Sequence, residues 1–162
     1  MSSLPPFQRF MDAHAHDVLR FLVASVGRHD ADDAFQETFL SALRAYPRLR
    51  PNSNLRAWVL TIAHNKALDS HRARTRRPLP VAEPQERPDP SATPDRDGAG
   101  ELWDRVRALP ARQREVLTLR YAGDLNHAEI ARVLGCSEAA ARRAAADGLK
   151  TLRKELPDVA ST

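Results

Sequence analysis

Cysteine and lysine are scarce in this chain of 162 residues, which has one cysteine, Cys136, and three lysines. A single cysteine excludes an internal disulfide and a cysteine cluster around a metal ion. No apolar run approaches the length of a membrane-spanning helix. The first ten residues, MSSLPPFQRF, lack the basic segment and apolar run of a signal peptide. We therefore expect a cytoplasmic protein with no membrane insertion.

The sequence motifs of common enzymes are also missing. There is no glycine-rich phosphate loop, no nucleophile motif and no convincing set of metal ligands. His14 and His16 lie near Asp12 and Asp17, but residues two apart point to nearly opposite sides of a helix. Solvated polar side chains explain them more simply. We expect no enzymatic activity, no metal and no cofactor.

Basic residues outnumber acidic ones, 25 to 21, and the net charge is +4. Such a balance favours an anionic partner, although a merely basic soluble protein would share it. Apolar residues make up 42% of the chain, so a hydrophobic core is feasible, in one domain or in two small ones. The positions of the charges must therefore decide what the protein binds.

The stretch from Asn126 to Leu156 has the pattern of two helices joined by a tight turn. Asn126 and Ser137 are suitable helix caps, and Gly135 stands where a left-handed turn residue is expected. Apolar and small residues recur at helical spacing, namely Ile130, Ala131, Leu134, Ala141, Ala144 and Ala145. This pattern predicts a helix-turn-helix, whose second helix enters a DNA major groove. An ordinary helical hairpin is the alternative.

Three helices are predicted before that, over residues 5–26, 30–46 and 55–76. The second would be capped by Asp30 and would bury one stripe: Ala31, Ala34, Phe35, Thr38, Phe39, Ala42, Leu43 and Tyr46. Its acidic residues either complement the helix dipole or form a docking face for a basic partner helix. The sequence alone leaves both interpretations open.

The third predicted helix, capped by Ser53 or Asn54, ends in a dense polar and basic cluster. This cluster comprises His64, Asn65, Lys66, Asp69, His71, Arg72, Arg74, Arg76 and Arg77. It suits a phosphate backbone, with Asn65 as a candidate base reader. The alternative is a solvated helix end whose cations complement the dipole.

Six of the twelve prolines fall in residues 78–100, where no helix can persist. We expect this segment to be an extended, flexible linker. Beyond it, residues 101–109 form a short helix with Leu102, Val106 and Leu109 on one side, and Pro110 opens another helix with a core face of Val116, Leu117 and 119–121. The predicted fold is all-α, with two small helical domains, 1–77 and 101–162, joined by the proline-rich linker.

Three stretches, in this order, resemble one protein family: DADDAFQETFLSAL, NLRAWVLTIAHNKALDSHRARTRR and LPARQREVLTLRYAGDLNHAEIARVLGCS. The chain resembles the extracytoplasmic-function (ECF) sigma factors of bacterial RNA polymerase, in the sigma-70 family. The resemblance implies that the first domain binds core polymerase and melts the minus-ten promoter element. It also implies that the helix-turn-helix reads the minus-thirty-five element, and that an anti-sigma factor is a partner.

Carried over by position, this resemblance assigns three groups of residues. Asp33, Gln36 and Glu37 would face the clamp helices of the large polymerase subunit. The displaced minus-ten strand would lie against Arg48, Asn54, His64, Asn65, Lys66, Asp69 and Arg72, with Asp69 orienting Asn65. The minus-thirty-five element would contact Ser137, Glu138, Arg142, Arg143 and Lys150.

The predicted recognition helix departs from the family pattern because it is rich in alanine. Only Arg142 and Arg143 are basic in its first half, and Asp147 would repel phosphates. Gly148 should weaken the helix by about 1 kcal/mol relative to alanine. An alternative function therefore stays open, that of a sigma-like regulator whose second domain mainly binds protein and reads DNA weakly.

Overall fold

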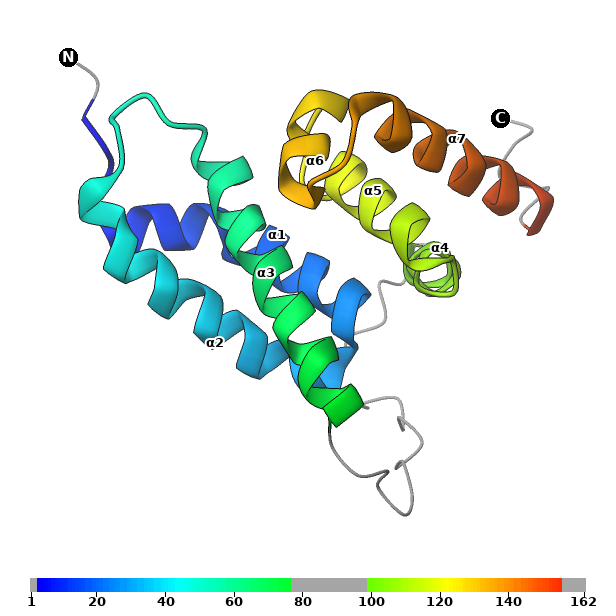
Figure 1. Cartoon of the computed structure of the whole chain (residues 1–162), viewed down its shortest axis with the longest axis horizontal. Helices are drawn as coiled ribbons and strands as arrows, with labels where there is room; N and C mark the ends of the chain where they lie inside the picture. Colours follow the sequence, from blue (N-terminus) through cyan, green and yellow to red (C-terminus); the bar gives the residue numbers. More distant parts are fainter. Residues whose placement is uncertain (1–2, 77–98, 156–162) are drawn as a thin grey trace.

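The computed structural model describes residues 3–76 and 99–155 (Figure 1). Within these two ranges it contains α-helices, one short 3₁₀ helix and no strand, which confirms the all-α class. Most of the predicted linker, residues 77–98, and the last residues, 156–162, lie outside the described residues. The first helix after the linker begins at Ala99, two residues earlier than predicted.

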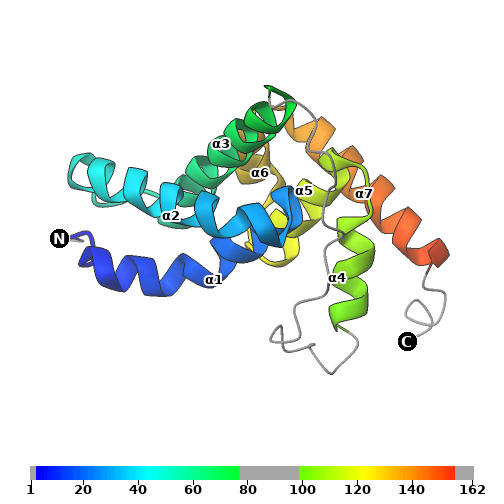
Figure 2. The ribbon, with the colours of Figure 1, turned by 90° about the horizontal axis from the view of Figure 1, so that it is seen from below.

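The first half consists of α1 (Phe7–Val26), α2 (Arg28–Ala45), the 3₁₀ helix η1 (Tyr46–Arg48) and α3 (Leu55–Arg76), and its three α-helices pack pairwise (Figures 1 and 2). Gly27, at a φ of 83°, ends α1 and lets α2 begin at the next residue. The prediction of Asp30 as the cap of α2 is wrong, because Gly27 occupies that position. Asp30 instead forms an ion pair with Arg74 of α3, whose Nε atom lies 2.9 Å from the Asp30 carboxylate.

An aromatic cluster surrounds Phe10, which is 1% exposed. Its ring centroid lies 5.2 to 6.2 Å from those of Phe7, Phe39, Tyr46 and Trp58. These five rings come from α1, α2, η1 and α3, and aromatic pairs at such separations attract beyond their buried area. The cluster therefore joins the three helices of the first half at one point.

The second half consists of α4 (Ala99–Arg107), α5 (Ala111–Tyr121), α6 (His127–Leu134) and α7 (Glu138–Glu155). The helix-turn-helix is confirmed in its local details. Asn126 caps α6 in a reciprocal capping box with Glu129, and Gly135 adopts the left-handed conformation at a φ of 69°. The Ser137 hydroxyl accepts a hydrogen bond from the backbone N–H of Ala140 at 3.0 Å and so caps α7. The small residues Ala141, Ala144, Ala145 and Gly148 are buried on α7.

Three residues predicted on core faces are exposed. Leu43 of α2, Tyr121 of α5 and Leu102 of α4 are 51%, 62% and 37% exposed. Helical spacing identifies the apolar side of a helix, but the neighbouring helices decide how much of that side is covered. In each case the packed stripe is narrower than the apolar stripe in the sequence.

The two halves pack against one another, α5 on α1 and α6 on α3, as Figure 1 shows. Their buried residues form one continuous hydrophobic cluster. None of the described helices is long and apolar enough to span a membrane. The division into domains 1–77 and 101–162 stays a prediction.

Candidate polymerase and promoter interfaces

One face of α2 points to solvent and carries the predicted polymerase-binding residues. Asp33, Gln36 and Glu37 are exposed, and Gln36 and Glu37 follow Asp33 by three and four residues, so they share this face. Leu40 and Leu43 continue it toward the end of the helix and are 47% and 51% exposed. The face is therefore acidic at one end and apolar at the other.

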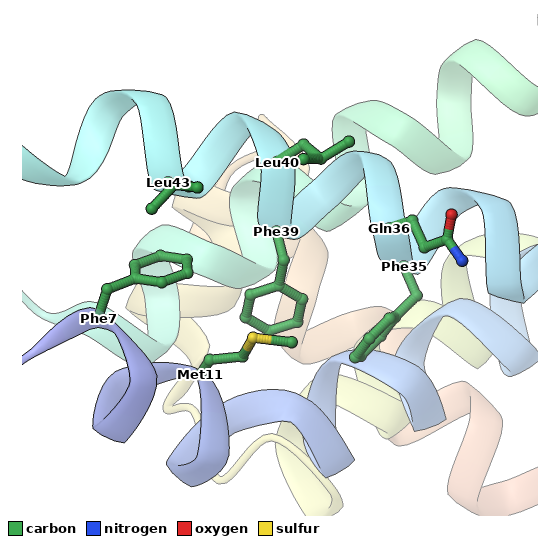
Figure 3. Close-up of a pocket in the computed structure, with 7 residues that line it drawn as sticks. All are labelled: Phe7, Met11, Phe35, Gln36, Phe39, Leu40 and Leu43. Atoms are coloured by element: carbon green, nitrogen blue, oxygen red, sulfur yellow. The ribbon is translucent and has the colours of Figure 1, made fainter.

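An open apolar groove of about 350 Å³ lies beside the two leucines, between α1 and α2 (Figure 3). In Figure 3 the side chains of Phe7 and Met11 rise from α1 toward Phe39 of α2. The groove is lined by Phe7, Met11, Phe35, Gln36, Phe39, Leu40 and Leu43. Sequence reasoning missed this feature, although Leu40 and Leu43 stand at helical spacing from Gln36. We name the exposed face of α2 together with this groove the α2 face.

The predicted minus-ten residues lie along α3 and the turn before it. Asn54, Asn65, Asp69 and Arg72 are exposed and fall on one side of the helix, because they are separated by whole turns. Lys66, adjacent to this side, is half-buried, and Arg48 is exposed on η1. The structure thus brings Asn65, Lys66, Asp69 and Arg72 together on one surface, with Asn54 at its start.

Asn54 has two structural roles. Its side-chain oxygen accepts a hydrogen bond from the backbone N–H of Ala57 at 3.1 Å, so it caps α3. Its side-chain amide donates a hydrogen bond to the carboxylate of Glu129 on α6. The residue expected to meet DNA is therefore bonded to the second half of the same chain.

Asp69 lies 3.9 Å from Arg72, one turn further along α3. Within the described residues the recorded partner of its carboxylate is Arg72 and not Asn65. Its carboxylate reduces the positive charge near Arg72. The structure therefore gives the predicted orienting role of Asp69 no support.

His64 differs most from its predicted role because it is only 7% exposed. Its Nδ1 atom is buried and has no hydrogen-bond partner. Burial lowers the pKa of His64, and the positive charge of Arg112 on α5 lowers it further. In this arrangement His64 is a buried side chain close to Arg112 of the second half, and it is closed to a DNA strand.

On α7, two of the predicted DNA contacts are engaged within the protein. Arg142 pairs with Glu138 at 2.5 Å, and the Ser137 hydroxyl serves as the helix cap. Arg143 and Lys150 are exposed and form no ion pair within the described ranges. Among the predicted DNA contacts on this helix, Arg143 and Lys150 are therefore the two cations most accessible to a phosphate.

Comparison with known proteins identifies the family. The sigma-70 region 2 profile matches residues 10–77, and the sigma-70 region 4 profile matches residues 99–152. The ECF RNA polymerase sigma factor ShbA of Streptomyces griseus is 34% identical over 158 residues, covering 87% of this chain and 83% of ShbA. This chain belongs to the ECF RNA polymerase sigma factors.

A longer relative of this ECF sigma factor is BldN of Streptomyces coelicolor, which is 35% identical over 161 residues. The alignment covers 94% of this chain and 61% of BldN. In the fold, the chain is similar to the sigma factor RpoE in its complex with the anti-sigma factor NepR from Bartonella quintana. The TM-score is 0.72 at 22% identity, covering 93% of this chain and 96% of RpoE. CnrH, in complex with the cytosolic domain of CnrY, gives a TM-score of 0.63 at 21% identity, covering 96% and 89%.

Proposed function

We propose that this ECF sigma factor binds core RNA polymerase and directs promoter-specific initiation of transcription. In this proposal it supplies recognition and strand opening, and it catalyses no reaction of its own. The observation that carries the proposal is the joint position of the α2 face and α3, which are held together by the aromatic cluster around Phe10. A polymerase bound to the α2 face would lie next to promoter DNA bound to α3.

The α2 face is proposed to bind the clamp helices of the large polymerase subunit. Asp33 and Glu37 favour a partner with basic side chains, and Gln36 can donate and accept hydrogen bonds. The groove beside Leu40 and Leu43 favours large apolar side chains from the same partner. A partner helix that is basic at one end and apolar at the other matches both halves of the face.

The minus-ten element is proposed to bind as a single strand along α3. Lys66 and Arg72 would contact its phosphates, and Asn65 would bond a base edge. Arg48 and Asn54 would border a base displaced from the duplex, which stacking and hydrogen bonds can hold. His64 joins this surface only when the second half moves away.

Region 4 is proposed to read the minus-thirty-five element through α7, with Arg143 and Lys150 on phosphates and Arg142 released from Glu138. The second candidate function, a regulator whose region 4 mainly binds protein, is favoured by one observation. The exposed side of α7 carries Ala139, Ala140 and Ala146, which offer DNA little to bond. The regulator would still bind core polymerase through the α2 face.

Three further parts of the proposal concern organisation. Residues 1–77 and 101–162 would be separate domains, with 78–100 as linker. The protein would act in the cytoplasm, where polymerase and DNA are found. An anti-sigma factor is a proposed partner, supported by the similarity to sigma factors whose structures were determined with one.

The test is in vitro transcription from genomic fragments with purified core polymerase, with and without this protein. Protein-dependent transcripts that share upstream sequences would establish the sigma function. Binding to core polymerase without any transcript would favour the regulator. No binding to core polymerase would refute both functions.

A further inference from the structure

We propose that the connection between α5 and α6, together with the first turn of α6, is an internal competitor for the minus-ten strand. The carboxylates of Asp124 and Glu129 occupy, on the start of α3, the place that DNA phosphates would take. This inference rests on the proposed minus-ten surface of α3 and adds its regulation. It concerns a contact within one chain and requires no anti-sigma factor.

The first contact joins two helix caps. Glu129 uses one carboxylate oxygen to accept from the backbone N–H of Asn126, at 3.0 Å, in the capping box of α6. Its other oxygen accepts from the side-chain amide of Asn54, the cap of α3. An anionic oxygen on an amide donor is the same contact that a phosphate oxygen would make with Asn54.

The second contact is ionic. Arg56, in the first turn of α3, lies 3.6 Å from the carboxylate of Asp17 on α1 and 3.7 Å from that of Asp124. Asp124 adopts a left-handed conformation, with a φ of 54°, two residues before the cap of α6. Its side chain is 83% exposed while the side chain of Arg56 is 37% exposed. Asp124 therefore places a negative charge at the rim of the surface rather than in a core.

One apolar contact and one cation–π contact also hold the two halves together. Gly123 fits against α3, because a Cβ atom there would lie 3.1 Å from Cδ1 of Leu60. At the other end of the interface, the guanidinium of Arg20 on α1 lies 5.2 Å from the ring centroid of Trp103 on α4. Arg112 of α5 is close enough to the buried His64 to lower its pKa. Two of the seven predicted minus-ten residues, Asn54 and His64, are thus withheld from DNA.

The contact is suited to opening because its polar members are exposed. Ion pairs between partly exposed side chains contribute only about 0–1 kcal/mol and weaken further in salt. A DNA strand that offers several phosphates can therefore displace two carboxylates. Displacement would expose His64 and free region 4 from α3 in the same step, so that strand binding and domain separation favour each other.

The test compares two variants that change the net charge equally. Glu129→Gln with Asp124→Asn removes both carboxylates from α3, and both replacements have nearly the same shape as the originals. Asparagine tolerates the left-handed conformation at 124, and glutamine can still accept from Asn126. The control is Glu101→Gln with Glu155→Gln, two exposed acids of the second half, of which Glu155 pairs with Arg105 of the same half. Circular dichroism checks that both variants stay helical.

Two measurements are made on the full chain. Fluorescence anisotropy follows a labelled single-stranded DNA of mixed sequence, about 12 nucleotides long. Small-angle X-ray scattering gives the radius of gyration. The E129Q/D124N chain should bind about tenfold more tightly than the native chain and be more expanded, since two contacts are lost. The E101Q/E155Q chain should bind the DNA less than about twofold more tightly than the native chain and should keep the native radius of gyration.

Equal gains in both variants would assign the effect to overall charge and overturn the proposal. Unchanged radius and affinity in E129Q/D124N would overturn it as well. A separate experiment tests whether the proposed minus-ten surface binds DNA. It adds Lys66→Ala and Arg72→Ala to the E129Q/D124N chain. If those changes leave DNA binding intact while scattering still reports expansion, the opening stands and the proposed DNA surface fails.

Discussion

Gly148 of α7 lies directly against Leu117 of α5: a Cβ atom at position 148 would be 2.7 Å from Cδ1 of Leu117 and 3.4 Å from Cβ of Gln113. Leu117 is only 2% exposed, so it cannot move aside without disturbing a packed core. Glycine has a low helix propensity, but at position 148 its lack of a side chain is what lets α7 approach α5.

Gly148→Ala should destabilise the protein although alanine is the better helix former. Overpacking a core costs about 1–3 kcal/mol, while the propensity gain is about 1 kcal/mol. We expect a net loss of about 1 kcal/mol in the free energy of unfolding, measured by urea denaturation. The control is Ala146→Gly at an exposed position of the same helix, which should lose about 1 kcal/mol from propensity alone. A more stable G148A protein would contradict the packing argument.

Leu43→Asp should weaken binding to core polymerase by at least about tenfold. Burying a leucine contributes about 1.5–3 kcal/mol, and each 1.4 kcal/mol corresponds to a factor of ten. Leu43 is already exposed in the free protein, so the fold should tolerate the change. The matched control is Leu19→Asp, a leucine of α1 that is 37% exposed and lies outside the groove. Affinity is measured by titrating labelled protein with core polymerase, and equal losses in both variants would rule out a specific role for the groove.

Arg143→Glu should reduce binding to promoter duplex more than Arg142→Glu, because Arg142 is already paired with Glu138. Losing one phosphate contact lowers the slope of log affinity against log salt by about 1. Binding is therefore measured over a series of salt concentrations, with Arg9→Glu on α1 as the control for net charge. If promoter use is unchanged even when Arg142→Glu and Arg143→Glu are combined, α7 does not read DNA and the regulator function is favoured.

The stability of the protein should fall as the pH drops below about 6.5. Burial lowers the pKa values of His64 and His14, and nearby arginines lower them further, so the unfolded chain binds protons that the folded chain does not. Stability therefore rises with pH between the lowered pKa and the usual value of 6.5. Urea denaturation at a series of pH values measures this slope.

His64→Gln should reduce that slope, because it removes one of the two histidines whose pKa burial lowers. Burial also raises the pKa of Glu115, which adds a pH dependence of the opposite sign at lower pH. Comparing the variant with the native chain cancels that contribution. An identical slope in the His64 variant would show that His64 stays accessible to protons in solution.

Local rules predicted the helix-turn-helix well, because its caps and turn depend on nearby residues. Asn126, Gly135 and Ser137 each have the predicted role. The helical periods of α1, α2 and α3 were also readable from the order of apolar residues. The prediction of Asp30 as a cap failed because Gly27 allows α2 to follow α1 without a loop.

Contacts between residues far apart in the sequence were not predictable in this way. No local pattern in the sequence shows that Asn54 meets Glu129, 75 residues away. The burial of His64 follows from the same packing of the two halves, so a polar residue in a basic segment was predicted at the surface. The groove was missed because it needs α1 beside α2, and helical spacing alone does not position two helices.

The cluster of five rings that includes Phe10 also limits how this protein can evolve. Since they join α1, α2 and α3 in one packing unit, a substitution at Phe10 would shift the proposed polymerase-binding surface and the proposed minus-ten surface together. Natural variation in promoter preference should therefore accumulate at exposed positions of α3 such as Asn65, while Phe10 and Trp58 change only in step with each other. The product of a duplicated copy of this gene could then recognise a new set of promoters and still bind polymerase.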